Sequence, residues 1–412
     1  MCKEFLIENA TIPPYMDKMT KDEQIEQVLH KGISEILPSK AFVETALRGT
    51  KKLTIYAGFD PTGDTLHIGH AIQLRKLRQF QDLGHKIIFL IGDFTARIGD
   101  PDKLAVRKPL TEKEIKRNLK QYKKQASKFI NFGGKNPAKV LFNNKWLGKL
   151  KFADVLNLAS QMTVDQMLKR DMFVKRHTEG KPIYVHEFMY PLMQGYDSVV
   201  MDVDGEVGGN DQLFNMLAGR TLMRQMKNKE KFVITMKLLE DNTGAKMGKT
   251  TGNMIAFTDS PKDMYGKIMS WTDGMIVPGF ELCTDYTMSQ VNAIKLELES
   301  GVNPRDIKMR LAFEIVKSAT SEKDALAAEE SFVSAFQKQE SVGEIDEVTG
   351  NGRTLEEVLV SEGIVESKSA LRRLMDAGAI SNFDTKEKIG DIKQPAIRGV
   401  YKVGKSRFIK IL

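Results

Sequence analysis

The chain has 412 residues, of which 41% are hydrophobic, which is enough for two or three domains with a substantial core. It has no apolar run long enough to cross a bilayer, early acids at its start, and two cysteines without histidines at metal spacing. These features argue against an exported, membrane-spanning, disulfide-stabilised or zinc-stabilised protein, and we expect a cytoplasmic one. Lys and Arg outnumber Asp and Glu by 62 to 54, which permits a nucleic-acid partner without requiring one.

Residues 1–50 predict a polar, helical lead-in to the core. An apolar run at 53–59 then predicts a strand buried on both faces of a parallel sheet. Proline and glycine break that strand, and the helix that follows, to about residue 83, carries His67 and His70 in its first turn. The unpaired N–H groups and the dipole of a helix start attract phosphate, so the pair is a candidate phosphate site. Ordinary capping or surface histidines would give the same short pattern.

A second apolar run at 86–92 completes a strand, helix and strand unit, which favours a doubly wound parallel sheet. The loop at 93–101 follows the carboxyl end of that strand, where open sheets of this type bind ligands. Asp100 is a candidate there, although an aspartate before proline is also a common turn residue. Residues 111–130 predict an amphipathic helix with a basic face, which suits solvent and a phosphate backbone about equally well.

Residues 184–197 predict another helix, from which Tyr190, Gln194 and Asp197 project on one face. A tyrosine, an amide and a carboxylate beside apolar neighbours favour a pocket for a small polar ligand. We expect strands at 198–203 and 232–236, with a glycine turn into a helix at 208–212 between them.

The loop at 240–252 holds Lys246 and Lys249 among three glycines. It is either an exposed turn or a segment that closes over a polyphosphate. Residues 261–337 predict helices, and residues 338–352 an acidic linker. Residues 353–412, with 12 basic and 8 acidic side chains, predict a separate small domain. A helix and a hairpin there carry basic residues that suit either RNA or solvent. They are Lys368, Arg372, Arg373, Lys405 and Arg407.

Taken in order, these segments resemble bacterial tyrosyl-tRNA synthetases, a family of class I aminoacyl-tRNA synthetases, over nearly the whole chain. The two family signatures are similar to Gly58-Phe-Asp-Pro-Thr with His67-Ile-Gly-His70, and to Lys246-Met-Gly-Lys-Thr250. The pocket segments of the family resemble three further stretches. They are Gly92-Asp-Phe-Thr-Ala-Arg-Ile-Gly-Asp-Pro101, Tyr190-Pro-Leu-Met-Gln-Gly-Tyr-Asp197 and Gly208-Gly-Asn-Asp-Gln212.

The resemblance implies an α/β chain: a Rossmann-type doubly wound catalytic domain, a helical domain and a small C-terminal α+β RNA-binding module. The corresponding ranges are 51–257, with a dimer insertion at about 101–185, then 258–337 and 353–412. It also implies a homodimer that activates L-tyrosine with ATP and Mg²⁺ and transfers the tyrosyl group to the terminal adenosine of tRNA(Tyr), with no structural metal. The lack of a serine or cysteine nucleophile with a base agrees with this chemistry.

Matching positions imply roles for individual residues. Catalysis would fall to Thr62, His67, His70, Lys246 and Lys249. ATP would contact Gly58, Asp60, His67, Gly69, His70, Gly209, Asp211 and Lys249. Tyrosine would contact Tyr56, Asp100, Tyr190, Gln194, Asp197 and Gln212, with Asp197 and Tyr56 at its phenol. The tRNA would contact Lys368, Arg372, Arg373, Lys405 and Arg407.

The chain departs from the family pattern at several positions. Gly248 and Thr250 replace the serines of the second signature, Asn210 replaces a serine or threonine, and residues 380–386 replace a short glycine turn. An aliphatic residue can also occupy the position of Tyr56. The alternatives are a tryptophanyl-tRNA synthetase, a small-molecule adenylating ligase on the same fold, and a non-catalytic RNA-binding protein. The pairing of Asp197 with Tyr56 favours a phenol, and the intact histidines and lysines favour catalysis.

Overall fold

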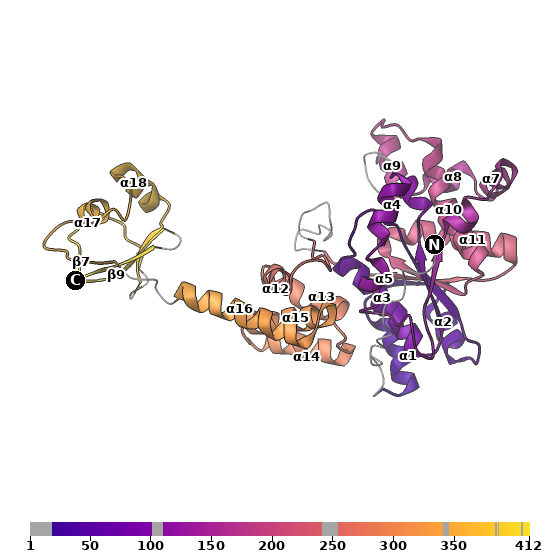
Figure 1. Cartoon of the computed structure of the whole chain (residues 1–412), viewed down its shortest axis with the longest axis horizontal. Coiled ribbons are helices and arrows are strands. Elements are labelled where there is room, and N and C mark those ends of the chain that lie inside the picture. The colour runs from indigo at the N-terminus through magenta and orange to yellow at the C-terminus, as the bar shows by residue number, and fades with distance from the viewer. Residues whose placement is uncertain are drawn as a thin grey trace. The chain divides into compact units, whose positions relative to one another are not determined.

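The computed structural model describes residues 19–100, 110–240, 254–340, 346–383, 385, 387–404 and 407–412. The chain divides into two compact units, Met1–Ala328 and Glu329–Leu412 (Figure 1). No helix among the described residues is both long enough and apolar enough to span a membrane.

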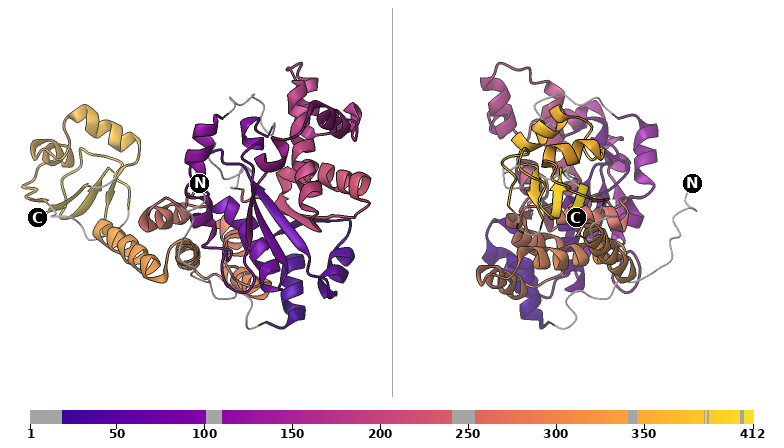
Figure 2. Two further views of the ribbon diagram at one scale, coloured as in Figure 1. Left: turned by 45° about the vertical axis from the view of Figure 1, so that its right-hand side comes forward. Right: turned by 90° about the vertical axis from the view of Figure 1, so that its left-hand side faces the viewer.

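The first unit is built around a six-stranded sheet in the order β1-β6-β5-β2-β3-β4. Five strands run parallel, and β1 pairs antiparallel with β6. The strands are β1 (Ile33–Leu37), β2 (Thr54–Phe59), β3 (Lys86–Ile91), β4 (Lys139–Phe142), β5 (Gly205–Gly209) and β6 (Phe232–Met236). Figure 2 shows these strands among the helices of the unit.

Two crossover helices explain why the sheet is covered on both faces. The connection from β2 to β3 contains α3 (Ile68–Asp82), and the connection from β5 to β6 contains α11 (Leu213–Lys227). The two connections advance in opposite directions across the sheet, so right-handed crossovers place α3 and α11 on opposite faces. The strand order reverses between β5 and β2, and this is where such sheets bind ligands.

Further helices complete the first unit. Those before the fourth strand are α1 (Lys21–His30), α2 (Lys40–Arg48), α4 (Glu112–Leu119) and α5 (Tyr122–Ala126). Between β4 and β5 lie α6 (Asn144–Leu147), α7 (Phe152–Ala159), α8 (Val164–Leu168), α9 (Asp171–Thr178) and α10 (Met189–Met201). Next come α12 (Pro261–Met269), α13 (Ile276–Cys283), α14 (Met288–Glu299) and α15 (Pro304–Ala319). The 3-10 turns are η1 (Thr95–Arg97), η2 (Val185–Phe188), η3 (Asn210–Gln212) and η5 (Asp273–Met275).

The C-terminal unit has its own sheet and core. Its strands follow the order β7-β10-β9-β8. They are β7 (Asp346–Val348), β8 (Ile380–Asn382), β9 (Gly399–Val403) and β10 (Arg407–Ile411), beside α17 (Leu355–Ser361) and α18 (Lys368–Asp376). Buried apolar residues such as Leu359, Leu371 and Ile409 form one cluster. The helix α16 (Glu322–Glu340) crosses the division between the two units.

Four sequence expectations differ from the structure. Residues 1–50 contain the strand β1 as well as helices, and residues 338–352 contain β7, which pairs with β10. The helix expected over 111–130 is two helices, α4 and α5. The prediction of a strand over 198–203 was wrong, because α10 continues to Met201. Val199, within that last part of the helix, packs against α11. Asp202 ends that helix in the left-handed conformation, with φ of 48°.

Candidate active site

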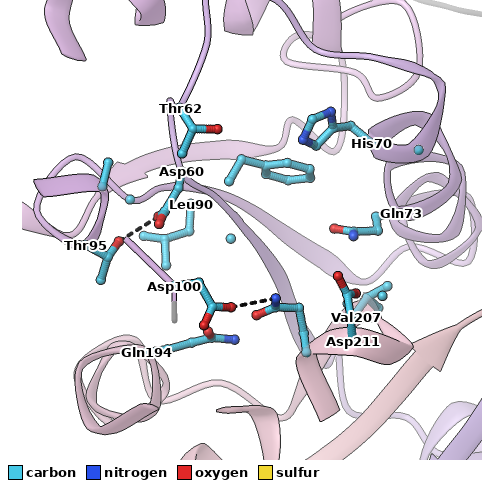
Figure 3. Close-up of a pocket in the computed structure, with 18 of the residues that line it drawn as sticks. Asp60, Thr62, His70, Gln73, Leu90, Thr95, Asp100, Gln194, Val207 and Asp211 are labelled. Atoms are coloured by element: carbon cyan, nitrogen blue, oxygen red, sulfur yellow. Dashed lines mark hydrogen bonds between the residues drawn. The ribbon is translucent and has the colours of Figure 1, made fainter. Parts of the chain in front are cut away.

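A cavity of about 930 Å³ lies at the reversal of strand order, where residues at the carboxyl ends of β2, β3, β5 and β6 line it. Figure 3 shows His70, Gln73 and Asp211 on one side and Asp60, Thr95, Asp100 and Gln194 on the other. The structure brings together all the candidate residues of the catalytic domain that it describes. They are Tyr56, Gly58, Asp60, Thr62, His67, Gly69, His70, Asp100, Tyr190, Gln194, Asp197, Gly209, Asp211 and Gln212. Lys246 and Lys249 lie outside the described residues.

The two histidines cap the helix α3 reciprocally. Nδ1 of His67 accepts a hydrogen bond from the Gly69 N–H at 3.1 Å, and Nδ1 of His70 accepts one from the His67 N–H at 3.1 Å. The ring centroids are 3.9 Å apart. Because each Nδ1 accepts a backbone hydrogen, we assign the proton of each neutral ring to Nε2. The turn therefore holds two imidazole N–H donors at a helix start, which suits an anionic ligand without requiring a charged histidine.

The segment after the undescribed residues 241–253 returns to this same turn. The Ile68 N–H donates to the Ile255 carbonyl at 3.0 Å, and the Phe257 N–H donates to the Leu66 carbonyl at 3.0 Å. Leu238, Leu239 and Met254, on the two sides of the undescribed stretch, line the cavity. Both ends of the lysine-containing segment are thus anchored at the cavity.

A carboxylate at the end of β2 is held by two hydroxyl groups. Thr95 Oγ1 donates to Oδ1 of Asp60 at 2.7 Å, and the Tyr190 hydroxyl donates to Oδ2 at 2.8 Å. Gly92 makes this approach possible, since a Cβ there would lie 1.9 Å from the Asp60 carboxylate. Burial, and next the charge of Asp60, raises the pKa of Tyr190 well above its ordinary value, so its hydroxyl keeps its proton.

Asp100 is held by three donors. Arg170 donates to Oδ1 at 2.6 Å, while Gln212 and Asn215 donate to Oδ2 at 2.8 and 3.2 Å. Arg170 is buried, with 6% of its side chain exposed, so the ion pair is shielded from water. A carboxylate has about four acceptor positions, so one on Oδ1 remains for a cationic group of a ligand.

A buried carboxyl group also lines the cavity. Asp197 is 2% exposed and accepts hydrogen bonds from Trp146 Nε1 at 2.7 Å and Asn143 Nδ2 at 3.2 Å. Burial raises its pKa well above the ordinary value, and the two hydrogen bonds oppose that rise. The Tyr56 hydroxyl lies 2.9 Å from Ser198 Oγ. Burial, together with the charges of Glu206 and Asp197, raises the pKa of Tyr56, so this phenol also keeps its proton.

A family model described as "tRNA synthetases class I (W and Y)" matches residues 48–337 of the chain. The chain belongs to this synthetase family. The tyrosine–tRNA ligase of Carboxydothermus hydrogenoformans is 43% identical over 408 residues, covering 94% of this chain and 97% of the relative. That of Thermotoga maritima is 41% identical, covering 95% of this chain and 98% of the relative.

Solved structures place the synthetase in the same fold. A C-terminally truncated mitochondrial tyrosyl-tRNA synthetase of Aspergillus nidulans aligns with a TM-score of 0.64 at 23% identity, over 76% of this chain and 94% of that one. A tyrosyl-tRNA synthetase of Archaeoglobus fulgidus, solved with L-tyrosine, aligns with a TM-score of 0.61 at 21% identity, over 76% of this chain and 100% of that one. At this level of identity the likeness shows the fold alone.

Several polar residues of the synthetase site escaped the sequence analysis. Asn143 and Trp146 follow β4, a four-residue strand whose signal was too short to notice. Thr95 lies within the loop that follows β3, of which the sequence singled out only the aspartate. Arg170 comes from a distant helical insertion, and no pattern in the sequence links it to Asp100. Within the described parts of the chain, no cluster of three histidine, cysteine or acidic side chains could hold a metal ion.

The candidate tRNA-binding residues belong to the C-terminal unit of the synthetase. Lys368, Arg372 and Arg373 are exposed on α18, and Lys368 Nζ lies 3.0 Å from the Glu356 carboxylate. Lys405 and the side chain of Arg407 fall outside the described residues. The structure thus presents three of the five basic side chains to solvent on one short helix.

Proposed function

We propose that this synthetase is a tyrosine–tRNA ligase. The observation that carries the proposal is the buried Asp197 carboxyl group, which lines the cavity and accepts hydrogen bonds from Asn143 and Trp146. Asp197 is an acceptor for a phenol O–H, and Tyr56 beside it supplies a second hydroxyl group. A site built to bond a hydroxyl group disfavours a ligand that lacks one. The ligase names of relatives that are 41–43% identical support the same choice.

In the first step, a carboxylate oxygen of tyrosine forms a bond to the α-phosphorus of ATP, and the bond to the pyrophosphate oxygen breaks. Tyrosyl-adenylate remains and pyrophosphate leaves with its electron pair. Asp100, Tyr190 and Gln194 bind the ammonium of tyrosine, and Gln212 lies nearby. No covalent bond to the enzyme is needed, so catalysis rests on positioning and on stabilising phosphate charge.

The histidine turn provides that stabilisation. Thr62, His67 and His70 contact the phosphates, with the two Nε2–H groups as donors. Lys246 and Lys249 neutralise the departing pyrophosphate, and ATP enters as its Mg²⁺ complex. Gly58, Asp60 and Gly69 line the ATP side, while Gly209 and Asp211 contact the ribose.

In the second step, a hydroxyl oxygen of the terminal adenosine of tRNA(Tyr) attacks the tyrosyl carbonyl carbon, and AMP leaves. The C-terminal unit, with Lys368, Arg372, Arg373, Lys405 and Arg407, binds the tRNA through its phosphates and shape. We also propose that the ligase is a cytoplasmic homodimer, joined partly through the insertion. That insertion exposes six large apolar side chains, which a partner subunit would cover. They are Phe152, Leu156, Val164, Val174, Tyr184 and Val185.

The decisive experiment is amino-acid-dependent exchange of pyrophosphate into ATP by the purified chain. Exchange that follows tyrosine supports the proposal. Exchange that depends on tryptophan would identify the other specificity of the family. Exchange that needs neither tyrosine nor tryptophan would favour another adenylating ligase. No exchange at all, with tRNA binding retained, would identify an RNA-binding protein.

A further inference from the structure

Behind the amino-acid end of the cavity lies a buried polar network centred on Lys231. Lys231 is fully buried, directly before β6, and its ammonium donates to Ser198 Oγ at 3.0 Å and to the Glu206 carboxylate. It also lies 5.9 Å from the centroid of the Tyr56 ring. Glu206 Oε1 in turn accepts from Gln194 Nε2 at 2.9 Å. One buried cation is therefore linked to both ends of the amino-acid subsite.

The fold leaves a space made for this ammonium. The helices α10 and α11 cross with Gly195 against Gly219, where a Cβ on Gly195 would lie 3.1 Å from the Gly219 backbone. A Cβ on Gly219 would lie 2.6 Å from Lys231 Nζ. A buried cation is costly unless it is paired and hydrogen-bonded, so a packing role alone would be served better by an apolar side chain.

The first branch of the network runs from Lys231 through Glu206 to Gln194 and sets the orientation of the Gln194 amide. A carboxylate only accepts hydrogen bonds, so Gln194 must turn its Nε2 toward Glu206. The Oε1 of Gln194 is then the atom left for the ammonium of the amino acid. Lys231 is the charged partner of the buried Glu206 carboxylate, so the orientation of the Gln194 amide depends on Lys231.

The second branch runs from Lys231 through Ser198 to Tyr56 and sets the direction in which the Ser198 hydroxyl group donates. An ammonium only donates, so Ser198 Oγ accepts from Lys231. Among the described residues, the other hydrogen-bond neighbour of Ser198 Oγ is the Tyr56 hydroxyl. Ser198 therefore donates to Tyr56, whose own hydroxyl proton can go to the Glu206 carboxylate or to the ligand phenol. The ligand phenol can then donate its proton to Asp197.

We propose that Lys231 is a positioning residue for the amino acid: through Glu206 it presents the Gln194 carbonyl oxygen to the ammonium, and through Ser198 it holds the Tyr56 hydroxyl group beside the phenol. This inference rests on the proposed function, because it assumes that tyrosine occupies the cavity. It assigns no contact between Lys231 and the substrate.

The test measures pyrophosphate exchange with full-length variants. Lys231→Met should raise the KM for tyrosine about 10- to 100-fold and leave the KM for ATP within about twofold, as expected for loss of hydrogen bonds at one subsite. Lys227→Met, at an exposed lysine in the last turn of α11, is the matched control and should leave both values unchanged.

A double variant separates positioning from packing. Lys231→Met/Glu206→Gln leaves no unpaired charge in the network, but the introduced amide can either donate or accept, so either orientation of Gln194 is satisfied. The KM for tyrosine should therefore stay as high as in Lys231→Met. A double variant that recovered the wild-type KM for tyrosine would overturn the proposal.

Ser198→Ala removes only the second branch and is a small change within α10. It should weaken the preference for tyrosine over phenylalanine while the first branch stays intact. An unchanged preference would overturn the assignment of Ser198. Equal changes in the ATP and tyrosine KM of Lys231→Met would overturn the assignment of Lys231. Absence of tyrosine-dependent exchange in the wild type would instead refute the proposed function.

Discussion

Asp197 illustrates how a single buried side chain limits which ligand the cavity accepts. Its two oxygens already receive hydrogen bonds from Asn143 and Trp146, which fix the carboxyl plane, and both donors come from the segment after β4. The remaining acceptor positions face a cavity that Tyr56 also lines. A ligand without a hydroxyl group would leave these groups unpaired in a buried place.

We predict that Asp197→Asn lowers kcat/KM for tyrosine by about 10²- to 10³-fold, because an amide N–H₂ then opposes the Asn143 amide and one acceptor is lost. Activation of phenylalanine should change far less, so discrimination falls. Pyrophosphate exchange with each amino acid measures both effects. Glu299→Gln, at an exposed position on α14, is the control. A variant that keeps its preference for tyrosine would contradict the role of Asp197.

For the histidine turn, we predict that His70→Ala lowers kcat of activation by about 10²- to 10³-fold, as expected for loss of one preorganised donor. The KM for tyrosine should hardly change, because the amino-acid end of the cavity is untouched. The lost cap should cost about 1 kcal/mol in the free energy of unfolding. His30→Ala, at an exposed histidine in the last turn of α1, should change neither quantity. A larger effect on KM than on kcat would refute the phosphate role.

At the scale of elements, long apolar runs predicted three of the six strands of the first sheet, β2, β3 and β6. Short or conflicting signals failed: β1 and β4 were missed, and β5 lies at Gly205–Gly209, where a glycine turn was expected. The strands β2 and β3 and the helix α3 fall where continuous hydrophobic segments and Gly84 indicated. The edge strand β1 has five residues, with the polar Ser34 and Glu35 next to each other, so it lacks the alternation of a strand. Its pairing with β6 is not revealed by any local pattern. At 198–203 the valines favour a strand locally, but packing of α10 on α11 decides for helix.

Lys31 ties the end of α1 to the residues after α13. Its ammonium donates to the carbonyl oxygens of Thr284, at 2.7 Å, and Tyr286. Burial lowers its pKa from 10.5 to about 7. Between these two values the unfolded chain binds the proton more tightly than the folded chain, so stability rises with pH across this window.

We therefore predict that the wild type gains about 2 kcal/mol of unfolding free energy, relative to Lys31→Met, between about pH 7 and pH 9. Denaturant unfolding of both proteins at several pH values measures this difference, in which the contributions of other groups cancel. Lys21→Met, at an exposed position on the same helix, should follow the wild type at every pH. A difference that stayed constant with pH would show that Lys31 does not titrate in this range.

At the scale of the molecule, the chain places the cavity and the C-terminal sheet in two separate compact units. The first unit contains the cavity, and the second has its own core and sheet. The sequence predicted a basic C-terminal domain from its charge. It did not predict that β7 belongs to that domain, because three residues in an acidic stretch carry too little signal and their partner β10 is far away in the chain.

We predict that a chain ending at Glu340, the last residue of α16, keeps tyrosine-dependent pyrophosphate exchange within about twofold, because every cavity residue is retained. Charging of tRNA(Tyr) should fall by about 100-fold or more, since the basic module is lost. The full-length double variant Arg372→Glu/Arg373→Glu should reproduce the charging defect. Raising the salt concentration should reduce the difference in charging between this double variant and the wild type. Equal loss of exchange and charging in the shortened chain would instead mean that the module supports the catalytic unit itself.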